Sequence, residues 1–238
     1  MKVFLCSLFS IVLFSANAQN PISVKQTFSE YLQSTNKDIM GTTKSMVAFS
    51  TKQETEGSAF LLKDWAKGTI VLKNNTTLLE SNNVLNFDKT RNLLILKTTG
   101  QNVIEIDMNP IARFQLQNES GTYSLVAIPQ LGSGYLIELY QDSLYSLYKT
   151  LNTQFYPSNY VNKGMYETGY KYDRYVDENK YYIRAKDGRV FPVSNNKKEL
   201  KKLAENLPAL NDYLKANELS STHLESSLIN LTAYLNHK

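Results

Sequence analysis

The stretch from Thr69 to Lys149 constrains the fold most, because it consists of one short β-type segment after another with almost no helical periodicity. Apolar and polar residues alternate along several segments, as at Val103–Asp107 and Arg113–Gln117, and a period of two is typical of strands with one solvent-facing side. The connections are rich in Asn, Asp, Gly, Ser and Lys, as turns are. A spacing of about 8 to 12 residues favours an antiparallel meander folded as a barrel or a sandwich.

The strands predicted in this stretch are Thr69–Lys73, Thr77–Glu80, Val84–Phe87, Leu93–Lys97, Val103–Asp107, Arg113–Gln117, Tyr123–Ile128, Tyr135–Tyr140 and Tyr145–Lys149. A further hairpin is predicted from strands at Tyr181–Ala185 and Val190–Val193, which are joined by Lys186-Asp187-Gly188. Asp-Gly supplies the positive φ angles that a type I′ turn requires.

The chain after residue 193 has helical periodicity. Ser194 or Asn195 is a candidate N-cap for a first helix, and Pro208 suits the first turn of a second helix. Thr222-His223-Leu224-Glu225 matches a capping box that would begin a third helix. Short helices are marginal alone, so we expect their apolar stripes to pack on one another or on the sheet.

The N-terminus has the pattern of a secretory signal peptide, in which Lys2 precedes an apolar run and the small residues of Ala16-Asn17-Ala18 end the segment. Cys6, the only cysteine, lies inside it; a lipid anchor there is an alternative that the large residues before it disfavour. The mature chain is then expected to contain no disulfide and no thiolate ligand or nucleophile.

The predicted parts of the chain are a signal peptide (1–18), an N-terminal lead-in (19–56), an antiparallel β domain (57–193) and a helical tail packed on it (194–238).

The net charge gives no indication of a nucleic-acid or anionic-membrane partner, and the hydropathy gives no indication of a transmembrane helix. The formal net charge is +4 for the whole sequence, which is too small to indicate binding to nucleic acid or to an anionic membrane. No apolar run after the signal peptide approaches the roughly 20 residues of a transmembrane helix. We therefore expect a soluble product without a transmembrane segment.

The residues of the common catalytic chemistries are scarce. His223 and His237 are the only histidines and are not spaced as a metal-binding pair, and Gly132-Ser133-Gly134 lacks the spacing of a nucleophile loop. No catalytic residue, cofactor site or metal site is therefore predicted. Glu105 and Asp107 share one face of a predicted strand, so a hydrolase that uses paired carboxylates is kept as an alternative.

The segment from Phe155 to Tyr182 has the most unusual composition, because its tyrosines are interleaved with basic residues. A tyrosine ring has a flat apolar face and a polar edge, which suits stacking on a sugar or binding of an extended peptide. The alternative is that these rings close the ends of the sheet. The candidate ligand surface consists of Trp65, Tyr160, Tyr166, Tyr170, Tyr172 and Tyr175.

The order of these pieces resembles a group of uncharacterised exported β-rich proteins typical of Bacteroidota. The stretches that carry the resemblance are Gly57–Phe60 leading to Trp65–Ile70, the hairpin from Gly134 to Leu147, and Lys180–Arg184 through Gly188 into Lys197–Leu200 and the last two helices. The resemblance implies a protein of the bacterial cell envelope and carries no activity and no site residue.

The sequence thus predicts a non-enzymatic exported module that binds a partner or has a structural role in the envelope. Its expected location is the periplasm or the inner face of the outer membrane. The expected partners are an envelope protein, a glycan or a peptide, without nucleic acid and without a cofactor. The alternatives are the carboxylate-based hydrolase and a barrel that carries an apolar ligand.

Overall fold

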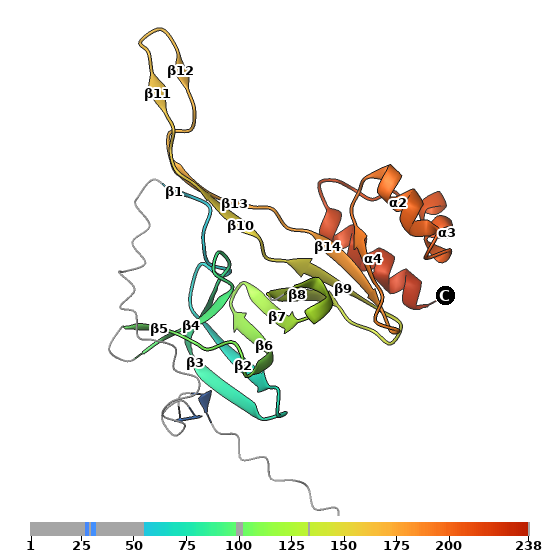
Figure 1. Ribbon diagram of the computed structural model, residues 1–238, viewed down its shortest axis with the longest axis horizontal. Coiled ribbons are helices and arrows are strands. Elements are labelled where there is room, and N and C mark those ends of the chain that lie inside the picture. The colour runs from blue at the N-terminus through green and yellow to red at the C-terminus, as the bar shows by residue number, and fades with distance from the viewer. Residues whose placement is uncertain (1–26, 29, 32–54, 99–101, 133, 238) are drawn as a thin grey trace, which may run out of the picture.

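A computed structural model describes residues 27–28, 30–31, 55–98, 102–132 and 134–237. The predicted signal peptide and most of the predicted lead-in lie outside these residues. Figure 1 shows a mainly β protein in which three helices follow the sheet, as the sequence predicts, and a narrow extension rises from the sheet. None of the helices in the described ranges has the length and apolarity that a membrane-spanning helix needs.

The largest element is one antiparallel sheet of ten strands. In spatial order the strands are β15 (Val190–Val193), β14 (Tyr181–Ala185), β9 (Tyr145–Thr150), β8 (Tyr135–Tyr140), β7 (Gly121–Ala127), β6 (Ile111–Asn118), β2 (Ala66–Leu72), β3 (Thr77–Asp88), β4 (Leu93–Lys97) and β5 (Val103–Glu105). The first and last strands of this order do not pair, so the sheet is open. A sandwich-like arrangement therefore describes the fold, and a closed barrel does not. The single-turn helix η1 (Pro129–Leu131) connects β7 to β8.

Two predicted strands are one strand in the structure. Thr77–Glu80 and Val84–Phe87 both belong to β3, which runs on through a break in its register with β2. Sequence periodicity separated them because the residues between, Ser81-Asn82-Asn83, are polar and resemble a turn. β3 does not turn here but continues through an irregularity in its pairing with β2, which is called the bulge below.

The N-terminal half of the sheet has its own hydrophobic core. Fully buried side chains of β2, β3, β4 and β6 pack together, and Phe28 from the N-terminal lead-in packs among them. Phe28, Glu30 and Tyr31 are helical. The Thr27 and Glu30 side chains each accept a hydrogen bond from the other residue's backbone N–H, which forms a capping box.

The C-terminal half of the sheet is covered by the helices α2 (Lys197–Ala204), α3 (Ala209–Ala216) and α4 (Leu224–Asn236). Their apolar stripes pack on Leu147 of β9, Ile183 of β14 and Val193 of β15. Figure 1 shows these helices on one side of β14 and β9. The expectation that the tail packs on the sheet agrees with this arrangement.

Two predicted helix caps are wrong. The N-cap of α2 is Asn196, whose side chain accepts the N–H of Lys198, and neither Ser194 nor Asn195 occupies that position. The capping box predicted at Thr222–Glu225 does not form, because the N-cap of α4 is His223 and it makes no side-chain cap. The Glu225 carboxylate instead accepts a hydrogen bond from Lys149 of β9 at 2.7 Å. The Glu225 side chain thus binds the sheet and not the backbone at the start of its own helix.

The predicted hairpin of β14 and β15 forms, but its turn is of another type and Arg184 pairs with Val190. Gly188 has φ = 88°, whereas Asp187 has no positive φ. The Ala185 N–H donates to the Arg189 carbonyl, and the Gly188 N–H donates to the Ala185 carbonyl. This is a three-residue loop with glycine in the left-handed region, the pattern of a type I turn followed by a bulge. It needs positive φ at only one residue.

Candidate functional site

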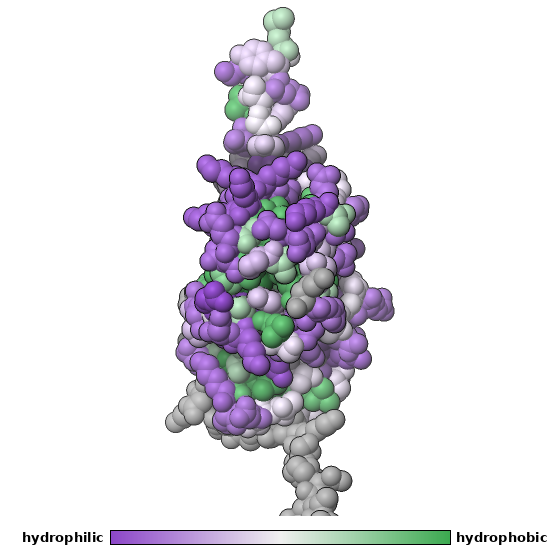
Figure 2. Space-filling model, turned by 90° about the vertical axis from the view of Figure 1, so that its right-hand side faces the viewer, coloured by the Kyte–Doolittle hydropathy of each residue, from purple (hydrophilic) through white to green (hydrophobic). Residues whose placement is uncertain are grey.

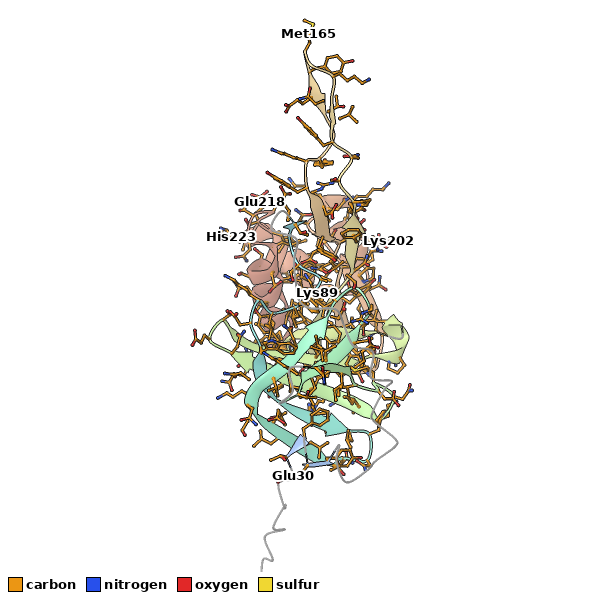
Figure 3. All side chains as sticks on the ribbon, turned by 90° about the vertical axis from the view of Figure 1, so that its left-hand side faces the viewer. Glu30, Lys89, Met165, Lys202, Glu218 and His223 are labelled. Carbon is orange, nitrogen blue, oxygen red and sulfur yellow. The ribbon has the colours of Figure 1, made fainter. Side chains whose placement is uncertain are left out.

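The tyrosine-rich segment forms a projecting arm, defined as residues 152–180, in which the chain leaves β9 and returns into β14. It is built from β10 (Thr153–Tyr156), β11 (Val161–Asn162), β12 (Glu167–Thr168) and β13 (Asp173–Asp177). β10 pairs with β13 and β11 pairs with β12, in both cases antiparallel. Figure 1 shows the arm extending well beyond the body, and Figure 3 places Met165 at its far end.

The middle of the arm is held by a third strand. β1 (Thr55–Glu56) pairs in parallel with β13 on the side opposite β10. Gly57 follows with φ = 75°, and a Cβ atom at this position would lie 2.3 Å from the Tyr175 carbonyl oxygen. Only glycine lets the chain pass this close with this backbone conformation.

An ion pair also ties the base of the arm to the body. The Lys89 ammonium donates to both oxygens of the Asp177 carboxylate at 2.8 and 3.0 Å, and the Thr153 hydroxyl donates to the same carboxylate. The Lys89 side chain is only 8% exposed. Figure 3 shows Lys89 below the arm. Burial alone would raise the pKa of Asp177, but the hydrogen bonds from Lys89 and Thr153 and the charge of Lys89 outweigh burial, so its pKa is lowered.

The middle of the arm is organised by one arginine. The Arg174 guanidinium lies 3.2 Å from the ring centre of Tyr170 and 5.9 Å from that of Tyr156. A guanidinium stacked on an aromatic face is a favourable cation–π contact. On the opposite face of the same strand pair, the rings of Phe155 and Tyr175 lie 5.1 Å apart. Both faces of the arm therefore carry aromatic side chains.

The tip of the arm is the most exposed part of the described chain that carries large apolar groups. Met165 is 98% exposed and Tyr166 is 57% exposed. The tip turns at Gly164, whose φ is 79° and whose N–H donates to the Asn162 side chain. Figure 2 shows the arm narrowing to a tip where hydrophobic colour reappears above a mostly polar surface.

The predicted ligand residues divide between two places. Tyr160, Tyr166 and Tyr170 are exposed on the arm, while Tyr172 and Tyr175 lie on it half-buried. Trp65 is not part of the arm; it lies next to the first residue of β2 and lines a polar cleft with residues of β3 and the β6–β7 turn.

Sequence reasoning missed other residues of the arm. Phe155, Tyr156 and Met165 are exposed, and Arg174 organises the rings around it. The signal that could have found them is the series of turn residues Pro157, Gly164 and Gly169 inside an aromatic segment. Such a series is typical of a long hairpin.

The arm carries charged side chains among its aromatic residues. Its charges balance, with four basic and four acidic side chains: Lys163, Lys171, Arg174, Lys180, Glu167, Asp173, Asp177 and Glu178. Several of these charges already have partners on the arm itself, as when Tyr156 donates to Glu178 at 3.1 Å and thereby has its pKa raised. The arm thus offers aromatic faces bordered by equal numbers of positive and negative charges.

The two carboxylates considered for hydrolysis have separate hydrogen-bond partners. Glu105 lies at the end of β5 and accepts a hydrogen bond from Arg91, which also contacts Asp88. Asp107 lies beyond the strand, and its side chain accepts the N–H of Asn109. Within the described ranges no group of three or more His, Cys, Asp or Glu residues is arranged to hold a metal ion.

Comparison with known proteins gives no match, whether to a family model, to a curated protein or to a solved structure.

Proposed function

We propose that this protein is an exported, non-enzymatic binding module of the bacterial cell envelope, and that the arm contacts a partner protein there. The observation that carries the proposal is the exposure of Phe155, Tyr166, Tyr170 and Met165 on an element that projects away from the body. Exposed aromatic and methionine side chains gathered on one element are characteristic of interaction sites.

The construction of the arm supports this role. The contact between Lys89 and Asp177 fixes its base, β1 pairs with its central part, and Arg174 fixes the rings there. A surface that is ordered before binding loses less conformational entropy when it binds. An arm of this kind would therefore hold a partner more tightly than a flexible loop of the same composition.

The arm also offers a backbone edge. β10 is the outer strand of the three-stranded group β1-β13-β10 in the described part of the chain. An extended segment of a partner could add to such an edge, with aromatic side chains on both faces to select its sequence. This geometry favours a protein partner over a glycan at the arm.

The charge balance of the arm argues against nucleic acid as its partner. Nucleic-acid binding requires an excess of basic side chains that neutralise phosphates, and the arm has no such excess.

A location in the periplasm or at the inner face of the outer membrane is part of the proposal. It rests on the signal-peptide pattern at residues 1–18 and predicts a mature N-terminus at Gln19, which mass spectrometry of the cell-envelope fraction tests.

The test of the arm places a photo-crosslinking amino acid at Met165 in the cells that make the protein. The matched control carries the same amino acid at Gln130, which is exposed on η1 outside the arm. We expect a crosslinked product of defined mass from position 165 and none from position 130. Equal products from both positions, or no product from position 165, would contradict the proposal.

Affinity measurements with the crosslinked partner then identify the side chains that bind. Replacing a central aromatic residue of an interface by alanine costs about 2 kcal/mol or more, which corresponds to roughly a thirtyfold rise in Kd. We expect losses of this size for Tyr166→Ala and Tyr170→Ala. Tyr123→Ala, which changes a half-buried ring of β7 instead, should leave the Kd unchanged.

A further inference from the structure

The bulge in β3 lies in a part of the sheet away from the arm (Figure 1). Ala66 of β2 pairs with Leu85 of β3, and Gly68 pairs with Glu80. One residue of β2 therefore faces the four residues 81–84 of β3. Bulges of this kind redirect side chains and often lie next to functional sites.

Hydrogen bonds between Glu80 and Asn82 hold the bulge in place. The Glu80 side chain is buried, and its carboxylate accepts hydrogen bonds from the backbone N–H of Asn82 at 3.1 Å and from the side-chain amide of Asn82 at 2.9 Å. Two hydrogen bonds to a buried carboxylate are strong contacts. These hydrogen bonds support the shape of the bulge.

A cleft of about 560 Å³ lies beside the bulge, within the size range of small-ligand sites. A smaller hollow of about 250 Å³ shares Lys67, Ser81 and Gln117 with it, so the depression is elongated along the sheet. The residues that line the cleft are one aromatic and eight polar: Asp64, Trp65, Lys67, Ser81, Asn83, Gln117, Asn118, Glu119 and Ser120.

The residues that line the cleft indicate which class of ligand it can bind. Most small-molecule pockets are lined by apolar side chains, and this cleft contains a single aromatic ring, that of Trp65, among amides, hydroxyls and carboxylates. A sugar ring has an apolar face that can stack on an indole and a rim of hydroxyls that both donate and accept hydrogen bonds. Amide side chains match such a rim, since each also donates and accepts.

The charges of the cleft argue against an anionic ligand. Asp64 and Glu119 contribute two negative charges and Lys67 one positive charge to the lining. A second cation, the Lys97 ammonium, lies 6.0 Å from the centre of the Trp65 ring. The two signs balance, so a phosphorylated, sulfated or uronic-acid ligand gains no net attraction.

From these observations we propose that the Trp65 cleft binds a neutral oligosaccharide, with Trp65 as the stacking platform and Asn83 and Gln117 as hydrogen-bonding groups. The site is separate from the arm and does not depend on the partner proposed for the arm.

The test uses the tryptophan itself, because Trp65 is the only tryptophan in the chain and its emission reports this cleft alone. The purified mature protein is titrated with short neutral oligomers of glucose, N-acetylglucosamine, mannose and xylose, and with oligogalacturonate as an anionic comparison. We expect a saturable change of emission with at least one neutral oligomer and none with oligogalacturonate. A response to oligogalacturonate alone, or to no member of the panel, overturns the proposal.

Variants separate specific binding from general quenching. Asn83→Ala combined with Gln117→Ala keeps the fluorophore, and the loss of two sets of hydrogen bonds should raise the Kd at least about tenfold. Gln130→Ala, which removes an exposed amide outside the cleft, should leave the Kd unchanged.

Calorimetry with Trp65→Ala should show no binding, and an intact circular dichroism spectrum confirms that this variant folds. Binding retained in Trp65→Ala or in the double variant contradicts the assignment. Replacement of the arm tip should leave the titration unchanged, which distinguishes a failure here from a failure of the arm proposal.

Discussion

The arm and the hairpin of β14 and β15 are both aromatic hairpins with glycine-containing turns, yet they have opposite surroundings. In the β14–β15 hairpin, Ile183 is fully buried and Tyr181 and Phe191 pack against the cluster formed with the helices. In the arm, Phe155 and Tyr166 are half or more exposed. The difference is the covering layer: α2 and α4 contact the sheet at β15, β9 and β8, and the helices leave the arm uncovered (Figure 1).

This comparison shows that aromatic composition does not determine burial. A hairpin gains hydrophobic free energy only where another layer excludes water from its side chains. The covered hairpin should therefore contribute to the stability of the body, and the arm should contribute to binding with little effect on stability.

The largest effect is expected where the helices cover the sheet. Leu231 of α4 is fully buried in the cluster with Leu147 and Ile183, so Leu231→Ala should lower the free energy of unfolding by about 2–5 kcal/mol. Urea unfolding followed by circular dichroism measures it. The matched control is Val161→Ala on the arm, which is 46% exposed and should change stability by less than about 0.5 kcal/mol. Similar losses for both variants would contradict the division.

A smaller effect is expected at the base of the arm, where it joins the body. Asp177→Asn leaves the buried Lys89 ammonium without its ionised partner and should cost about 1–2 kcal/mol, a value kept low because the Asp177 side chain is 46% exposed. The control is Asp212→Asn in the exposed pair with Lys215 on α3, for which we expect about 0.5 kcal/mol or less. Equal effects would show that the arm base is not specially held.

The same ion pair predicts a pH dependence. The folded-state pKa of Asp177 lies below its ordinary value of 3.8, so its contribution is fully present above pH 3.8 and is lost as pH falls through the lower folded value. The difference in stability between the wild type and Asp177→Asn should therefore shrink below pH 3.8. A difference that stays constant down to pH 2 would show that the carboxylate charge is not responsible.

A local effect is expected at Arg174. Arg174→Met removes the stacking on Tyr170 and Tyr156, which at an exposed site is worth about 0.5–1 kcal/mol. Amide hydrogen exchange of the arm should become faster while exchange in β14 stays unchanged, because segments can open locally below the global unfolding free energy. Arg189→Met, near Phe191 on the covered hairpin, is the matched comparison and should not change exchange in the arm.

The smallest effect on stability is expected from removal of the arm tip. Asn159 and Tyr170 are hydrogen-bonded across the hairpin, so residues 160–169 can be replaced by Asn-Gly, which suits a two-residue hairpin turn. The free energy of unfolding should change by less than about 0.5 kcal/mol while binding of the arm partner is lost. A large loss of stability would mean that the tip belongs to the folding core.

Much of the sheet was predictable because the alternation of apolar and polar residues indicates which face of a strand is exposed to solvent. The pattern at Arg113–Gln117 agrees with β6, whose apolar side chains Phe114 and Leu116 are buried. The join of two predicted strands into β3 was not predictable, since a bulge and a turn both use polar residues such as Asn82 and Asn83. The buried Glu80 that holds the bulge has no signature in the sequence.

The candidate site was predictable only in part. The tyrosines of residues 155–182 are conspicuous in composition, and Tyr160, Tyr166 and Tyr170 are exposed on the arm. Sequence could not tell that Trp65 lies in a separate cleft, because strand pairing and not proximity in the chain brings Trp65 near Gln117 and Glu119.

By itself, the sequence determined the mainly β fold with three terminal helices and the presence of an aromatic, charge-balanced segment. These properties follow from local periodicity and composition, which act over a few residues. Only the tertiary structure decided that the sheet stays open, that the helices cover β14 and leave the arm bare, and that Lys89 anchors Asp177 across the fold. These features depend on contacts between residues far apart in the chain, which local patterns do not encode.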